Sequence, residues 1–173
     1  MSESVKQKPI KIIQNMDQAI GVMRSAGTWL ADSGKNPSKW WKLENLNRTF
    51  LSRHAKEHEF YVGLIDDVPA VAAVIMMLDK NDDWKSVDGD HPKKALYIHW
   101  LCVDRQFAGR GLPKMMIDFA ERLAKKNGVS LLRLGANADK KKLQDIYEDL
   151  GFRLVGTKQE DSRTSAFYQK TVG

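Results

Sequence analysis

The most constraining feature of the sequence is a stretch near its middle where the hydrophobic period changes from two to about 3.6 and then back to two. Residues 95–103 alternate in the manner of a strand. After a turn that contains Gly109 and Gly111, apolar residues recur at helical spacing over 112–126, and Leu131 to Leu134 again suits a strand. A strand, helix and strand in this order predict a mixed α/β sheet rather than a regular doubly wound fold.

The remaining elements follow from the same periodicities and from turn residues. The predicted strands are 10–13, 60–65, 68–78, 152–157 and 166–170. The predicted helices are 17–33, 39–50 with an alternative end at Lys56, and 140–150. Asp66 and Asp67 form a short turn in a hairpin, the acidic segment 79–94 is expected to be a loop, and Gly151 ends the last helix. The expected order is β-α-α-β-β-β-α-β-α-β-β.

Length and composition indicate a folded protein. The chain has 173 residues, 42% of them hydrophobic and 29% charged, which excludes a mainly disordered chain and suits one domain over residues 1–173. No internal repeat or Gly/Ser-rich linker divides the sequence.

Cys102 is the only cysteine, which excludes an intrachain disulfide framework and a cysteine-built zinc or iron–sulfur site. The first ten residues lack the apolar core of a signal peptide, and the longest apolar run, 68–78, is too short to span a bilayer. We therefore predict a cytoplasmic protein with no membrane partner.

The formal net charge of +6 favours an anionic partner, which is a phosphate-bearing cofactor, a nucleic acid or an acidic membrane surface, and the charge alone does not choose among them. The turn before the central helix reads Asp-Arg-Gln-Phe-Ala-Gly-Arg-Gly-Leu-Pro over residues 104–113. Two glycines can expose backbone N–H groups beside the positive end of a helix, and Arg110 and Lys114 would add charge, so the turn is a candidate pyrophosphate cradle. The alternative is an ordinary tight turn. The sequence contains no complete dinucleotide fingerprint and no Walker loop, so a nucleotide-triphosphate enzyme is disfavoured.

Three segments together give the chain a resemblance to a known family. They are Leu101 to Asp104, Ala108 to Leu112, and Tyr147 to Phe152, and their order and spacing resemble those of the GCN5-related N-acetyltransferases. The resemblance implies the acyl-CoA N-acyltransferase fold and transfer of acetyl from acetyl-CoA to an amine, with no metal. We predict direct attack of the amine in a ternary complex with no covalent acyl-enzyme, because Cys102, the only cysteine, lies on the strand face opposite His99.

The resemblance assigns site residues. The cofactor-binding set is Leu101, Cys102, Val103, Ala108, Gly109, Arg110, Gly111, Leu112, Pro113, Lys114 and Asn137. Tyr147 would protonate the departing CoA thiolate, although its place among apolar residues also suits a core tyrosine.

His99 is the candidate base, since histidine changes charge near neutral pH, but a packed strand histidine is equally compatible with the sequence. Simple alternation over 95–103 puts His99 on one face of the strand with Tyr97 and puts Trp100 and Cys102 on the other.

Trp29, Trp40 and Tyr97 are candidate walls of the acceptor pocket, because the first helices and nearby loops select the acceptor in the family. The acceptor amine itself stays open. Edge strands near the carboxyl terminus can pair two copies, so a homodimer is a further expectation.

Two residues of the turn depart from the family pattern. Ala108 stands where Arg or Gln is usual, and Pro113, which has no N–H, stands where Gly or Ala is usual. They leave open a non-catalytic acyl-CoA-binding or sensor module as the alternative function. A basic nucleic-acid-binding protein ranks last, because no recognition motif accompanies the charge.

One metal motif is also present. His54, Glu57 and His58 match the H-x-x-E-H pattern of a zinc-protease class, provided that both histidines lie one turn apart on a helix. No third protein ligand can be assigned, so we expect a solvated helix end instead.

Overall fold

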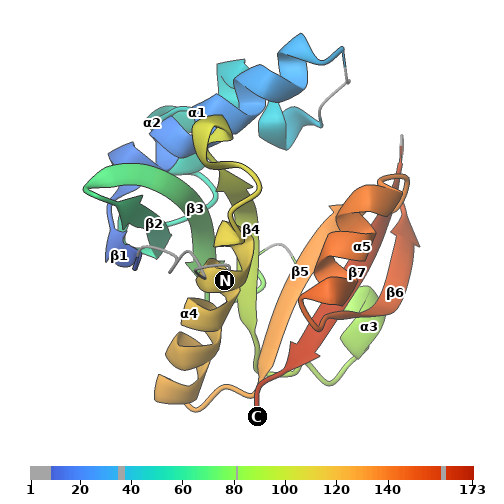
Figure 1. The fold of residues 1–173 in the computed structure, drawn as a ribbon. Helices are drawn as coiled ribbons and strands as arrows, with labels where there is room; N and C mark the ends of the chain where they lie inside the picture. Colours follow the sequence, from blue (N-terminus) through green and yellow to red (C-terminus); the bar gives the residue numbers. More distant parts are fainter. Residues whose placement is uncertain (1–8, 35–37, 81, 161–162) are drawn as a thin grey trace, which may run out of the picture. The chain divides into compact units, whose positions relative to one another are not determined.

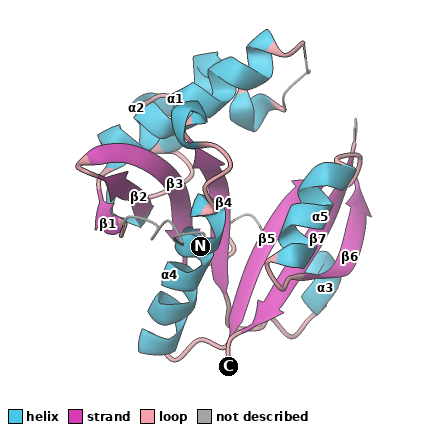
Figure 2. Cartoon of the chain, viewed as in Figure 1, coloured by secondary structure: helices cyan, strands magenta, loops and turns pink. Residues whose placement is uncertain are grey.

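The computed structural model describes residues 9–34, 38–80, 82–160 and 163–173 (Figures 1 and 2). With short 3-10 helices labelled η, the elements run β1 (Lys11–Gln14), α1 (Met16–Asp32), η1 (Lys39–Trp41), η2 (Leu43–Asn45), α2 (Arg48–Leu51), η3 (Glu57–Glu59), β2 (Phe60–Ile65), β3 (Val68–Met76), α3 (Lys85–Asp88), β4 (Leu96–Val103), η4 (Arg105–Phe107), α4 (Leu112–Lys126), β5 (Leu131–Asn137), α5 (Lys141–Asp149), β6 (Arg153–Gln159) and β7 (Thr164–Thr171). The strands follow the order β1-β2-β3-β4-β5-β7-β6 in a mixed seven-stranded sheet, which confirms the predicted fold class.

The chain forms two compact units, which we describe separately. Unit 1 contains the chain up to Ala72 together with Cys102–Met115, and unit 2 contains Ala73–Leu101 and Met116–Gly173. The single domain over 1–173 stays a prediction. Among the described helices, none is long and apolar enough to cross a bilayer.

In unit 1, α1 begins at an N-cap that the sequence analysis did not identify. The side chain of Asn15 accepts from the Gln18 N–H at 3.0 Å, and Asp17 lies in the first turn. Gly27 lets this helix approach the segment after it, because a Cβ at this position would lie 2.7 Å from a Leu46 methyl. Arg24 also donates to the carbonyls of Leu43 and Leu46, so the middle of α1 is held against that segment.

The predicted helix over 39–50 is wrong. The segment forms η1, η2 and α2, with Lys42 extended between the first two. Two asparagine side chains bond the local backbone, Asn45 to the Lys39 carbonyl and Asn47 to both the Glu44 carbonyl and the Phe50 N–H. Such bonds compete with the regular helical ladder, and periodicity alone does not detect them.

The expected helix end at the zinc-like motif is also absent. His54 lies in the turn after α2, and His58 lies in η3. Within the part of the chain that the structure describes, no group of three His, Cys, Asp or Glu side chains is placed to hold a metal ion.

The hairpin of β2 and β3 is confirmed. Asp66 and Asp67 have φ values of 49° and 65°, the left-handed pair that a two-residue turn between twisted strands requires. Short polar side chains tolerate this conformation best after glycine.

The strand β4 is confirmed, but its regular alternation is not. Trp100 has a φ of 50°, so the expectation of two uninterrupted faces over 95–103 is wrong at this residue. A left-handed residue inside a strand redirects the side chains that follow it. The register that joins β4 to β5 pairs Leu96 with Leu132 and Tyr97 with Arg133, before the interruption.

In unit 2, β5, β7 and β6 form an antiparallel ladder, with α5 lying over it (Figure 1). On α5 the predicted apolar side is only partly buried, because Tyr147 is 8% exposed whereas Ile146 is 41% exposed. Gly151, with a φ of 93°, ends the helix as predicted.

The segment 79–94 is not simply a loop, because it contains α3. This short helix lies against β6, where Val87 would be 3.2 Å from a Cβ at Gly156. Trp84, directly before α3, is buried and packs edge-on against Phe167 with ring centroids 5.0 Å apart.

A buried arginine explains why this segment is ordered. Arg133 of β5 is fully buried and donates to both carboxylate oxygens of Asp88 at 2.7 Å. It also donates to Gln169 at 2.9 Å and to the Tyr97 hydroxyl at 3.4 Å, and its guanidinium lies 4.4 Å from the ring centroid of Trp84. These contacts attach α3 to the sheet.

We expect Asp88→Asn to lower the free energy of unfolding by about 3–5 kcal/mol, because it leaves the Arg133 charge buried without its counter-ion. The hydrogen bond from Arg133 holds the pKa of Asp88 below its ordinary value. The stabilisation of the folded protein by the Asp88 carboxylate is therefore present above a pH of about 4, and it is lost as the pH falls through the lowered pKa of Asp88. Urea unfolding between pH 7 and pH 2 should show that the wild type loses its advantage over the variant in acid.

The control is Glu160→Gln, since Glu160 is 41% exposed and its Oε2 lies 4.0 Å from Nε of Arg163. Its midpoint should stay near that of the wild type. An Asp88→Asn variant as stable as this control would contradict the assigned importance of the buried pair.

Candidate functional site

The candidate cradle is the connection between β4 and α4, in unit 1 (Figure 2). Gly109 and Gly111 have φ values of 82° and 72°, a conformation that side chains other than glycine rarely adopt. Residues 108–111 are exposed. The turn therefore presents its backbone at the amino end of a long helix.

The electrostatics of the turn favour a negatively charged ligand. The first N–H groups of a helix have no intrahelical acceptor and carry positive partial charge, and Leu112 and Lys114 supply such groups. Pro113 supplies none, but its lack of an N–H costs nothing in the first turn of a helix. Arg110 adds a cation, which lies 5.3 Å from the Phe107 ring centroid. These residues fit a pyrophosphate group.

The predicted pantetheine-binding residues lie at the end of β4. Leu101 and Val103 are half-buried, and Cys102 is 8% exposed. Burial raises the pKa of the Cys102 thiol far above its usual range, so this group stays protonated at neutral pH.

His99, the candidate base, is half-buried on β4 beside Trp100. Burial lowers the pKa of His99, and the negative charge of Asp79 opposes this shift. At neutral pH the imidazole is consequently in the form that can accept a proton.

Tyr147 lies in the last turn of α5, on the side that faces β7. Its ring packs against Tyr168 and Phe152, with centroid distances of 5.7 and 6.4 Å. Lys170 donates to the Leu150 carbonyl at 2.8 Å and forms an ion pair with Glu121 at 2.9 Å, which holds the end of this helix.

Asn137 is the last residue of β5. Its side-chain oxygen accepts from the Asp139 N–H at 3.0 Å, and the residue pairs with Ser165 of β7. The side chain thus shapes the connection to α5.

The three predicted wall residues lie in different surroundings. Trp29 on α1 is 39% exposed and lies under Arg105, whose guanidinium is 4.0 Å from the ring centroid. Trp40 in η1 packs against Phe50 and His54. Tyr97 is 5% exposed, and its hydroxyl accepts from Arg133.

The predicted residues divide between the two units. Unit 1 contains the turn, Cys102, Val103, Trp29 and Trp40, while unit 2 contains Tyr97, His99, Leu101, Asn137 and Tyr147. Sequence reasoning did not identify Arg105 as a partner of Trp29 or Asp79 as the charge near His99. The acidic run around Asp79 was visible, but its relation to His99 depends on tertiary structure.

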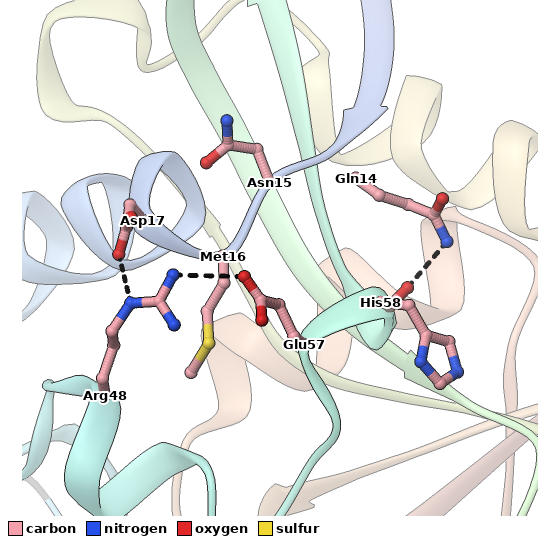
Figure 3. A pocket seen from close by; sticks show the side chains of 7 residues that line it. All are labelled: Gln14, Asn15, Met16, Asp17, Arg48, Glu57 and His58. Atoms are coloured by element: carbon pink, nitrogen blue, oxygen red, sulfur yellow. Dashed lines mark hydrogen bonds and ion pairs between the residues drawn. The ribbon is translucent and has the colours of Figure 1, made fainter.

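Unit 1 also has a polar cleft of about 530 Å³ that the sequence analysis did not predict (Figure 3). It is lined by Gln14, Asn15, Met16, Asp17, Arg48, Glu57 and His58. Arg48 donates to Asp17 at 2.6 Å and to Glu57 at 3.2 Å, which lowers the pKa of Asp17. Two carboxylates share this one guanidinium, so these three side chains carry no excess positive charge, in contrast to the turn with Arg110 and Lys114.

The sequence profile of the acetyltransferase (GNAT) family matches residues 26–152. The chain belongs to this family. The match extends from α1 to the residue after Gly151, and it therefore includes both the glycine turn and the segment from Tyr147 to Phe152. This GNAT protein is an acetyl-CoA-dependent acyltransferase.

Individual relatives are consistent with the family match. An uncharacterised N-acetyltransferase, YesJ of Bacillus subtilis, is 26% identical over 149 residues, which cover 84% of this chain and 80% of the relative. A GNAT acetyltransferase of Listeria monocytogenes superposes with a TM-score of 0.75, at 22% identity and 98% coverage of each chain. The PaiA N-acetyltransferase of Thermoplasma acidophilum, solved with coenzyme A, gives 0.66 at 15% identity, with 94% of this GNAT chain and 99% of that chain covered.

Proposed function

We propose that this protein transfers acetyl from acetyl-CoA to an amine by direct attack of the amine in a ternary complex. The observation that carries the proposal is the turn in which Gly109 and Gly111 adopt left-handed conformations at the amino end of α4. Such a turn suits the pyrophosphate of CoA. Coenzyme A in the structure of the Thermoplasma relative supports the same ligand.

In the proposed complex, backbone groups at the end of β4 pair with the pantetheine arm as an added strand. Of the amides from Ala108 to Leu112 that the resemblance assigns to the pyrophosphate, those of Gly109 to Leu112 hold it, because the Ala108 N–H donates to the Arg105 carbonyl at 3.3 Å. Arg110 and Lys114 act as counter-ions. Asn137 is the remaining residue of the proposed cofactor-binding set. Pro113 and Ala108 reduce the donors and charge available in this cradle without removing its backbone geometry.

Tyr147 is the proposed general acid. As the amine attacks the thioester carbonyl, the bond to sulfur breaks and the thiolate leaves with the electron pair. The phenol of Tyr147 supplies the proton that makes it a free thiol. Packing of the ring by Tyr168 and Phe152 supports this role, since it fixes the position of the hydroxyl.

His99 is the proposed proton acceptor for the attacking amine, either directly or through water. Its lowered pKa keeps the imidazole neutral at pH 7. Covalent relay through Cys102 is disfavoured, because its thiol is buried and its pKa is raised.

Titration of acetyl-CoA by isothermal calorimetry tests the cradle. Gly111→Trp should abolish binding, because the indole would fill the turn. The matched control is Gly34→Trp, which puts the same side chain at a glycine with the same φ of 72° at the end of α1. It should bind acetyl-CoA as the wild type does. If the wild type shows no binding, the proposed function is wrong.

Tyr147→Phe should lower kcat about a hundredfold or more while leaving the Kd for acetyl-CoA within about twofold. Release of free thiol with an amine panel measures the rate. Tyr61→Phe, which removes a half-buried hydroxyl that accepts from Gln14, is the control and should retain wild-type kcat. Equal rates for the two variants would sink the role of Tyr147.

The pH dependence of kcat/KM tests His99. The rate should rise with pH through the pKa of His99, which burial places below its ordinary value of about 6.5. His99→Gln should lower the rate and remove this limb of the profile. A profile that keeps the limb in the variant would assign the proton transfer to another group.

A further inference from the structure

Arg105 is attached to α1 by two separate contacts. Its guanidinium lies over the ring of Trp29, with Cζ 4.0 Å from the centroid, and its backbone N–H donates to the Ser25 hydroxyl at 3.3 Å. Ser25 and Trp29 are four residues apart and so lie on the same face of the helix. One face of α1 therefore contacts both the backbone and the side chain of Arg105.

Arg105 is also the first residue of the segment that leads into the glycine turn. Asp104 is fixed before it, since its N–H donates to the Ala70 carbonyl at 2.8 Å and its carboxylate accepts from the Gln106 N–H at 3.1 Å. The Ala108 N–H donates back to the Arg105 carbonyl at 3.3 Å. The position of the turn thus depends on a short segment anchored to β3 and to α1.

The contact also bears on what Trp29 does. A guanidinium over an indole ring is attracted to its face, at an exposed site by about 0.5–1 kcal/mol and by more where water is excluded. An acceptor molecule that stacked on this face would have to displace Arg105. The observed contact therefore connects the ring to the cradle rather than leaving that face for the acceptor.

We propose that Trp29 is a positioning residue for the binding of acetyl-CoA. It acts through Arg105, and together with Ser25 it holds the segment 105–108 so that Gly109 and Gly111 present their amides at the start of α4. The inference rests on the proposed function of the turn. It assigns Trp29 to the binding of acetyl-CoA, whereas the sequence analysis predicted that Trp29 lines the acceptor pocket.

Calorimetric titration of acetyl-CoA into Trp29→Leu, Trp29→Phe, Arg105→Gln and the Trp29→Leu/Arg105→Gln double variant tests the proposal. We expect Trp29→Leu to raise the Kd about three- to tenfold, and Trp29→Phe, which keeps a ring, to recover most of the affinity. The double variant should bind no more weakly than the weaker single variant, because both remove the same contact. The KM for the acceptor should stay within about twofold.

Arg122→Gln is the matched control. It removes an exposed arginine that lies 6.0 Å from the Phe119 ring centroid, near the other end of α4. The Kd for acetyl-CoA should not change. An unchanged Kd in Trp29→Leu, or a change confined to the KM for the acceptor, would overturn the proposal.

Amide hydrogen exchange of the free protein separates failure of this inference from failure of the proposed function. Trp29→Leu should speed exchange of the amides of 105–112 while leaving those of β5 and β7 at the wild-type rate. This readout does not require acetyl-CoA to bind. If the wild type fails to bind acetyl-CoA but the exchange changes as expected, the proposed function is wrong and Trp29 still positions the turn, but not for this ligand. Unchanged exchange at 105–112 overturns the positioning role.

Discussion

The guanidinium of Arg133 lies where water cannot solvate it, and much of unit 2 is arranged around this one charge. A buried ion is costly unless its hydrogen-bonding groups are satisfied. Asp88 takes both of its terminal nitrogens, Gln169 takes Nε, and Trp84 covers its face. Two of these partners come from the segment between β3 and β4, so the charge fixes a connection that would otherwise be a long acidic loop.

The buried charge also affects the surroundings of the candidate base, His99. Arg133 contacts both Asp88 and Trp84, and the N–H of Trp84 donates to the carboxylate of Asp79 at 2.7 Å. The charge of Asp79 in turn opposes the effect of burial on the pKa of His99. A pair with no direct part in the proposed chemistry thereby helps to set the electrostatic environment of the imidazole.

The sequence predicted the elements that depend on local signals. The strand, glycine turn and helix of residues 95–126 were predictable because periodicity and glycine conformational freedom determine them. The broken helix at 39–50 was not, because asparagine side chains compete for its backbone. Arg133 gave no signal either, since arginine in a strand usually marks a solvated position.

In the candidate site, too, local features were predictable from the sequence and contacts between distant residues were not. The residues of the turn were assigned from its two glycines and from the family resemblance, and Gly109 and Gly111 adopt left-handed conformations in the structure. The surroundings of Tyr97 and Trp29 were not predictable, because they depend on Arg133 and Arg105, which are distant in sequence. For Tyr147, the core and catalytic interpretations are compatible. The helix α5 has only nine residues, and Ile146, which precedes Tyr147 in it, is 41% exposed. Burial of the Tyr147 ring therefore supplies much of the packing that would hold its hydroxyl in place.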